Sequence, residues 1–198
     1  VDDLGDTGRY SSLALDSSGE PVIAYQVVES ATTTPGRPSR RVRVASRSGG
    51  VWSSADIHAV EMACRPGLCP DGASCLESGD CVMPTADCGE CADGEGCAAG
   101  TCTAALPDGY VEDLLPATGR YNELVSTPSG LALAWYDRTA GNVLAASYDG
   151  SWSESFLIDG YGAMNEDIGD CGQGLSLAVD SVGAWHLSYV DGTEETLR

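Results

Sequence analysis

Short apolar segments recur along the chain in a fixed order. Residues 12–16 and 21–25 are mostly apolar, and a polar turn with Gly19 separates them. The same arrangement returns around Gly130 and again around Gly183. Apolar segments of this length predict β-strands, and a glycine between two of them predicts a hairpin turn. The hydrophobic pattern therefore predicts an all-β chain in which each copy of the pattern begins with a β-hairpin.

A polar motif precedes the hairpins. Residues 3–8 read DLGDTG, and residues 167–172 repeat them as DIGDCG. The tetrapeptide TGRY occupies residues 7–10 and 118–121. The second strand of each hairpin carries a tyrosine, which is Tyr25, Tyr136 or Tyr189. The turn glycines and these tyrosines are both spaced by 111 and then 53 residues. A repeat of about 40–50 residues made of short strands is typical of a β-propeller blade.

Two further strands are predicted in each of the first two repeats. Residues 41–45 and 142–146 supply the third strands, and Trp52 and Trp152 begin the fourth. These tryptophans are predicted to occupy equivalent places and to pack between neighbouring blades. The third repeat reaches Arg198 where its third strand is expected to begin. We therefore expect an incomplete propeller of four-stranded blades, with two and a half blades present.

The repeats divide the chain into four predicted regions. The boundaries are 1–60 for the first blade, 61–108 for a cysteine-rich insert, 109–165 for the second blade and 166–198 for the first half of the third. An incomplete ring leaves sheet edges and apolar faces exposed. We expect four side chains of the last half-blade to be half exposed without further chain, namely Leu177, Val179, Leu187 and Tyr189. More sequence, another chain or further copies of this chain would complete the ring, and Cys171 is a candidate for a disulfide to that partner.

Eight of the nine cysteines lie in the insert, among residues too small and polar to form a hydrophobic core. Such a segment predicts four internal disulfides, because cross-links can replace a core. The cysteines are Cys64, Cys69, Cys75, Cys81, Cys88, Cys91, Cys97 and Cys102. The short hairpins predicted around Cys97 and Cys102 resemble those of EGF-like or knottin-like modules. A zinc site formed by the last four of these cysteines is the alternative.

The composition narrows the cellular context. The chain has 30 acidic and 10 basic residues, which gives a formal net charge of −20. Nucleic acid and anionic membrane surfaces are therefore not expected partners, because both require basic patches. The cysteine content predicts an oxidising, extracellular or cell-surface location. The sequence contains no apolar run long enough for a membrane helix, and we expect any export signal to have been removed upstream.

Two sets of residues are candidates for a functional site. Arg9 and Tyr10, repeated as Arg120 and Tyr121, stand where the inner strands begin, so they are candidates for facing a propeller axis. The acidic turns offer oxygen ligands of the kind that Ca²⁺ binds. The calcium candidates are Asp3, Asp6, Asp167 and Asp170. The two histidines have no sequence neighbours that suggest a nucleophile relay, and no catalytic residues are assigned.

One local resemblance bears on the fold. Residues 147–152 read SYDGSW and residues 46–52 read SRSGGVW, at the turns before the fourth strands. These hairpins resemble shortened Asp-boxes of sialidase-like propellers, in which the Asp-box is a structural turn. The whole repeat also resembles repeat propellers of secreted bacterial proteins, for which surface binding is the usual inference. The predicted function is a non-catalytic binding or adhesion module for a glycan or a protein. The alternatives are a fragment of a glycoside hydrolase and a structural subunit completed by other chains.

Overall fold

The computed structural model contains β-strands and no helices in the part of the chain that it describes. That part consists of residues 6–29, 36–61, 64, 69, 71–76, 80–83, 91–93, 95–98, 100–104, 117–160 and 170–198. The all-β prediction is confirmed. No helix among these residues is long and apolar enough to cross a membrane. The chain forms two compact units, which we call the sheet unit (Val1–Val27, Arg41–Val60 and Ala117–Arg198) and the cysteine unit (Val28–Arg40 and Glu61–Pro116).

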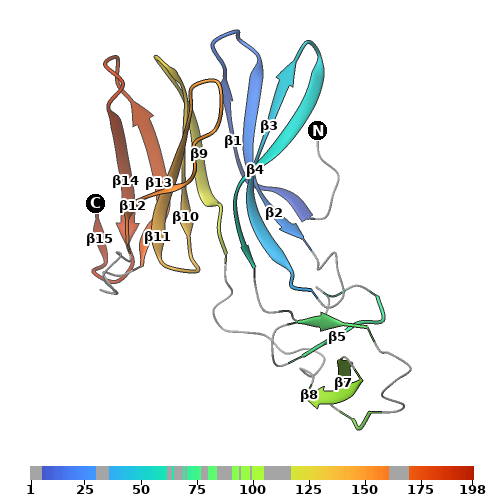
Figure 1. The fold of residues 1–198 in the computed structure, drawn as a ribbon. Coiled ribbons are helices and arrows are strands. Elements are labelled where there is room, and N and C mark those ends of the chain that lie inside the picture. Colours follow the sequence, from blue (N-terminus) through green and yellow to red (C-terminus); the bar gives the residue numbers. More distant parts are fainter. Residues whose placement is uncertain are drawn as a thin grey trace. The chain divides into compact units, whose positions relative to one another are not determined.

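Three separate sheets make up the sheet unit (Figure 1). Sheet 1 has the order β1-β2-β3-β4, formed by β1 (Asp6–Leu15), β2 (Pro21–Glu29), β3 (Ser39–Ser48) and β4 (Val51–Glu61). Sheet 2 has the order β12-β11-β10-β9, formed by β9 (Arg120–Thr127), β10 (Gly130–Asp137), β11 (Asn142–Tyr148) and β12 (Phe156–Asp159). Sheet 3 has the order β13-β14-β15, formed by β13 (Cys171–Val179), β14 (Trp185–Asp191) and β15 (Thr196–Leu197). The hairpins of all three repeats therefore form where the sequence predicts them.

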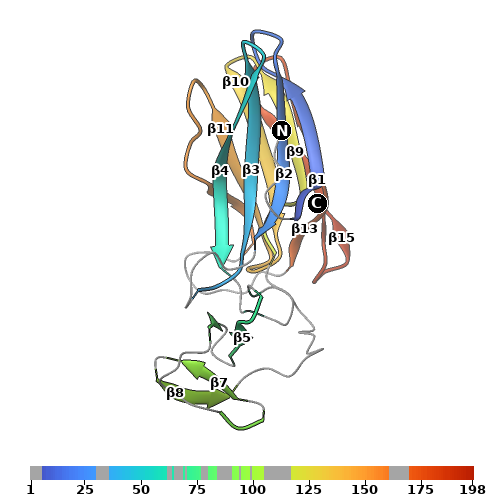
Figure 2. The same ribbon diagram turned by 90° about the vertical axis from the view of Figure 1, so that its right-hand side faces the viewer.

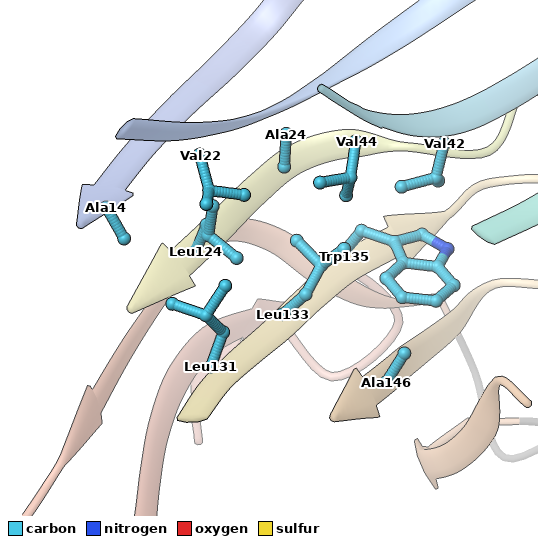
Figure 3. Close-up of a cluster of buried hydrophobic side chains, with 10 residues drawn as sticks. All are labelled: Ala14, Val22, Ala24, Val42, Val44, Leu124, Leu131, Leu133, Trp135 and Ala146. Carbon is cyan, nitrogen blue, oxygen red and sulfur yellow. The ribbon is translucent and has the colours of Figure 1, made fainter. Parts of the chain in front are cut away.

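Sheets 1 and 2 are joined by one apolar cluster. Figure 3 shows that small side chains of sheet 1 point toward larger side chains of sheet 2. Sheet 1 contributes Ala14, Val22, Ala24, Val42 and Val44, and sheet 2 contributes Leu124, Leu131, Leu133, Trp135 and Ala146. Trp135 is fully buried. Burial of such side chains stabilises the contact by about 1.5–3 kcal/mol for each large one.

Sheets 2 and 3 meet in the same way. The other face of sheet 2 presents Ala132, Ala134, Val143 and Ala145. Sheet 3 covers them with Leu175, Leu177 and Tyr189, and with the partly buried Trp185 and Leu187. In each contact, a small face lined mainly by alanine and valine meets a large face lined mainly by leucine and aromatic residues. The large face of one sheet packs on the small face of the sheet before it.

One residue fewer in the second hairpin changes the register of β10. Val125 pairs with Ala132, seven positions on, whereas Ala178 pairs with His186, eight positions on. A shift of one residue moves a side chain to the other face of a sheet. Trp135, not Tyr136, therefore lies on the large face where Tyr25 and Tyr189 lie in their own sheets. The predicted equivalence of the three tyrosines is wrong for Tyr136, which points toward sheet 3.

The two predicted inter-blade tryptophans do lie on corresponding faces. Trp152 packs against the cluster between sheets 1 and 2. Trp52 packs against Tyr25, Val27 and Ala45, on the face of sheet 1 that points away from sheet 2. Both tryptophans are therefore on the large face of their sheet. Only Trp152 has a neighbouring sheet to pack against within the described residues.

Sheet 3 is better covered than the sequence suggests. Leu177 is 6% exposed and Tyr189 is 8% exposed. The expectation that they would be half exposed is wrong, because both belong to the large face of sheet 3 and sheet 2 covers that face. The third strand also begins within the chain, since β15 pairs with β14 through Leu197 and Val190.

The cysteine unit combines the predicted insert with the long loop between β2 and β3. Gly36 and Cys81 exchange backbone hydrogen bonds of 3.2 and 2.8 Å, and Arg37 forms a 2.9 Å ion pair with Asp80. The strands of this unit are β5 (Ser74–Cys75), β6 (Cys81–Val82), β7 (Glu95–Ala98) and β8 (Thr101–Ala104). Figure 2 shows the β7–β8 hairpin. The β2–β3 loop and the predicted cysteine-rich insert are therefore parts of one structural unit.

Disulfides hold the cysteine unit together, as predicted. The described pairs are Cys64–Cys75, Cys69–Cys81 and Cys91–Cys102. Cys97 is also disulfide-bonded, and Cys88 lies outside the described residues. Zinc binds cysteine as a thiolate, so the cysteines paired in these disulfides do not form the alternative zinc site.

Candidate functional site

Two exposed tyrosines lie side by side on the edge strands of two different sheets. The ring centroids of Tyr10, in β1, and Tyr121, in β9, are 5.3 Å apart with the planes tilted by 60°. Tyr10 is 40% exposed and Tyr121 is 38% exposed. Both were predicted to face a common axis, and the structure brings them together. An exposed aromatic pair offers an apolar surface with hydroxyl groups at its margin.

The backbone beneath these rings is unfavourable for tyrosine. Tyr10 has φ of 51° and Tyr121 has φ of 48°, in the left-handed region where a side chain costs about 1–2 kcal/mol. Gly174 stands at the same place in the third repeat and has φ of 61°. A Cβ on Gly174 would meet no atom within 4 Å. The repeat therefore needs a left-handed residue there, and glycine meets that need without strain.

A third tyrosine, Tyr136, packs against one ring of this pair. The ring of Tyr136 stacks on Tyr121 with 6.3 Å between centroids. Its hydroxyl donates a hydrogen bond to Asp170, which also accepts one of 2.8 Å from Gln173. Burial raises the pKa of Tyr136, and the bond to Asp170 raises it further. Tyr136 is 2% exposed, so this phenol is a buried structural donor rather than an accessible nucleophile.

Buried amides fix the backbone around the two tyrosines. The side-chain amide of Asn122 donates to the carbonyl oxygens of Tyr10 and Gly119, and so ties β1 to the segment that leads into β9. Gln26 donates to the carbonyl oxygen of Thr118 in the same segment. The carbonyl oxygens of both amide side chains are buried and accept no hydrogen bond from the described residues. These two residues were not predicted, and only Asn122 stands beside a TGRY motif in the sequence.

The two predicted arginines have different surroundings. Arg9 forms an exposed 2.7 Å ion pair with Asp6. Arg120 is half-buried, and its positive charge lies close enough to Tyr136 to oppose the rise in the pKa of that phenol. The Nε atom of Arg120 is buried without a hydrogen-bond partner in the structure. The tyrosine pair is thus flanked by charged groups that can donate and accept hydrogen bonds.

The predicted calcium ligands are only partly described. The carboxylate of Asp6 forms an ion pair with Arg9. The carboxylate of Asp170 accepts hydrogen bonds from Tyr136 and Gln173. Asp3 and Asp167 lie outside the described residues. The calcium site remains a prediction, and the two described carboxylates already have protein partners.

The structure also places a serine beside one histidine. Nδ1 of His58 lies 3.0 Å from Oγ of Ser155, which is 97 residues away and therefore invisible to a search of sequence neighbours. Burial lowers the pKa of His58, so the imidazole is neutral near pH 7. Its Nε2 is buried without a hydrogen-bond acceptor in the structure. A catalytic imidazole is oriented by such an acceptor, so the described residues do not complete a nucleophile relay around this pair.

Cys171 is a free, buried thiol. Burial raises its pKa to about 11, with the carboxylates of Asp159 and Asp191 adding to the shift. The thiol is therefore protonated at neutral pH, and disulfide formation requires a thiolate. The predicted disulfide to a partner stays a prediction, and it would require Cys171 to become exposed.

Two comparisons with known proteins identify no relative that carries this site. No family model matches this chain, and no curated protein matches it either.

Proposed function

We propose that this chain is a non-catalytic recognition module that binds a glycan on Tyr10 and Tyr121. The three sheets are interpreted as consecutive blades of a propeller, and β1, β9 and β13 as the strands that line its axis. The exposed tyrosine pair then faces the axis at one end. The disulfides of the cysteine unit are consistent with an extracellular location.

One observation supports a role for the tyrosine side chains beyond folding. The left-handed backbone at positions 10 and 121 would be satisfied by glycine, as it is at Gly174. Tyrosine is present twice at a position that disfavours it, and both rings are exposed. Strained residues that keep an exposed side chain cluster at ligand sites. A pair of rings with flanking arginine and aspartate groups suits a sugar, which has an apolar ring face and hydroxyl groups at its edge.

A glycan array followed by titration calorimetry tests this proposal. The chain should bind a restricted set of oligosaccharides, and Tyr10→Ala or Tyr121→Ala should weaken binding by at least tenfold, or about 1.4 kcal/mol. Phe156→Ala is the matched control, because Phe156 is 43% exposed on β12, outside the site. An unchanged affinity in both tyrosine variants would refute the site.

Two other outcomes can be distinguished in the same experiment. Cleavage of a bound oligosaccharide would support the glycoside hydrolase alternative. Binding of a protein but of no glycan, with the same loss in the tyrosine variants, would keep the site and change its ligand.

A further inference from the structure

We propose that two copies of this chain associate head to tail, so that the large face of sheet 1 packs on the small face of sheet 3 of the second copy. This inference is independent of the ligand proposed above. It rests on the two sheet faces of the sheet unit that no other sheet of the described chain covers.

The large face of sheet 1 carries exposed leucines along β1. Leu13 is 61% exposed and Leu15 is 51% exposed, while Ala14 between them is buried against sheet 2. Alternation along β1 therefore places both leucines on the large face, with Ile23 and Trp52. Leu124 occupies the position of Leu13 in the second repeat and is 3% exposed, because sheet 1 covers it. The same repeat position is thus buried where a preceding sheet is present and open where none is.

The free face of sheet 3 has the complementary character. Its exposed residues on β13 and β14 include Ser176, Ala178 and Ser188, which are small and uncharged. His186 and Val190 lie on the same face. In both internal contacts a small face receives a large face, so the exposed small face of sheet 3 matches the exposed part of the large face of sheet 1 around Leu13 and Leu15.

A glycine and an aliphatic residue mark each internal contact. A Cβ on Gly119 would lie 3.0 Å from Val42 of sheet 1, and a Cβ on Gly172 would lie 3.0 Å from Val143 of sheet 2. Gly8 is the equivalent glycine of the first repeat, and nothing lies within 4 Å of its Cβ position. Gly119 and Gly172 therefore each pack against the third strand of the preceding sheet.

Leu197 is the residue that would cover Gly8. Tyr136 pairs with Val143 in sheet 2, and Val190 pairs with Leu197 at the corresponding place in sheet 3. Leu197 is therefore the third repeat's counterpart of Val42 and Val143. It is 78% exposed, whereas Val42 and Val143 are fully buried. A second copy that presents Gly8 and Leu13 would bury it.

Two copies are the smallest number that can form such a contact in both directions. The described residues of each chain contribute three sheets to the sheet unit, and a heterologous contact that repeats forms a closed ring when its rotation closes. Two copies provide six sheets, within the usual range of about four to eight blades in a propeller. The charge of −20 on each copy opposes association. Salt should therefore strengthen the dimer, because the Debye length falls from about 30 Å at 0.01 M to about 8 Å at 0.15 M.

Sedimentation velocity of the chain and three variants tests the proposal. The unmodified chain should form a concentration-dependent dimer that tightens with salt. Leu13→Asp on the large face and Leu197→Asp on the small face should each produce a monomer with an unchanged circular dichroism spectrum. Val182→Asp is the matched control, because Val182 is 86% exposed at the β13–β14 turn and lies on neither face.

Mixing the two monomeric variants distinguishes this arrangement from a symmetric contact. Each variant keeps one intact face, so the Leu13→Asp and Leu197→Asp chains should together form a weaker dimer joined by one contact. A dimer that survives Leu197→Asp would show that two large faces pair with each other. A monomer at every concentration and salt would show that a second copy does not cover sheet 1. Either result overturns the proposal.

Discussion

The first two repeats differ from the third in the residue that occupies one left-handed backbone position. Tyr10 and Tyr121 occupy a left-handed position that Gly174 occupies in sheet 3. The difference separates two requirements that a single repeat could not separate. The strand needs a left-handed residue to enter the sheet, and glycine is sufficient for that. The tyrosine rings of the first two repeats add an exposed surface that the third repeat lacks.

Burial differs between repeats at positions that are otherwise equivalent, and this difference predicts the largest effect. Leu124→Ala should lower the free energy of unfolding by about 2–5 kcal/mol, because Leu124 lies in the closed contact between sheets 1 and 2. Leu13→Ala should change it by less than about 0.5 kcal/mol in the monomer, because Leu13 is exposed. Urea unfolding followed by tryptophan fluorescence measures both values. Similar losses would contradict the assignment of the two faces.

The strain at the left-handed position can be measured in the third repeat, where no ring contact interferes. Gly174→Ala should lower the free energy of unfolding by about 1–2 kcal/mol, because the added Cβ meets no atom and only the backbone conformation is penalised. Ser176→Ala, two residues further along β13, is the control and should have little effect. A glycine of the cysteine unit, such as Gly96 in β7, would not report on this sheet. A loss for Gly174→Ala no larger than that of the control would mean that the position carries no strain.

The second and third repeats also share a turn carboxylate with opposite pKa shifts. Asp137 accepts from the Thr139 N–H, and burial raises its pKa. Asp191 accepts from the N–H groups of Thr193 and Glu194; the bond from Glu194 contributes most to lowering its pKa. The pair with Arg198, at 2.9 Å, lowers it further. The negative charge of the turn carboxylate therefore stabilises the folded protein at Asp191 in sheet 3 and destabilises it at Asp137 in sheet 2.

These shifts predict opposite effects of pH. A carboxyl with a lowered folded pKa stabilises the protein above its unfolded pKa, and that contribution is lost as pH falls through the folded pKa. Asp191→Asn should therefore reduce stability at pH 7 and less so below the ordinary pKa of 3.8. Asp137 has a raised pKa and costs stability as pH rises above 3.8, so Asp137→Asn should be neutral or stabilising at pH 7. Urea unfolding at both pH values checks the signs, and equal responses of the two variants would refute the comparison.

The sequence predicted the strands and hairpins well, because they depend on local periodicity. It misplaced Tyr136, because a hairpin shorter by one residue reverses the face of a strand and spacing alone does not reveal the register. It identified Tyr10 and Tyr121 as a candidate site from the repeated TGRY motif. The left-handed backbone at these residues, the amide of Asn122 and the contact between His58 and Ser155 depend on tertiary packing. That the β2–β3 loop and the cysteine-rich segment form one unit could not be predicted from local sequence patterns either.

The most direct test of the central claim is to measure stability and glycan binding together in Tyr10→Gly. Glycine removes the exposed ring and relieves the left-handed strain, while the carbonyl oxygen that Asn122 contacts remains. The account predicts that glycan binding is lost and that the free energy of unfolding stays within about 1 kcal/mol of the original value, because relief of about 1–2 kcal/mol of strain offsets the lost ring contact. Retained binding with a loss of more than about 2 kcal/mol of stability would mean that Tyr10 serves the fold, and would contradict the account.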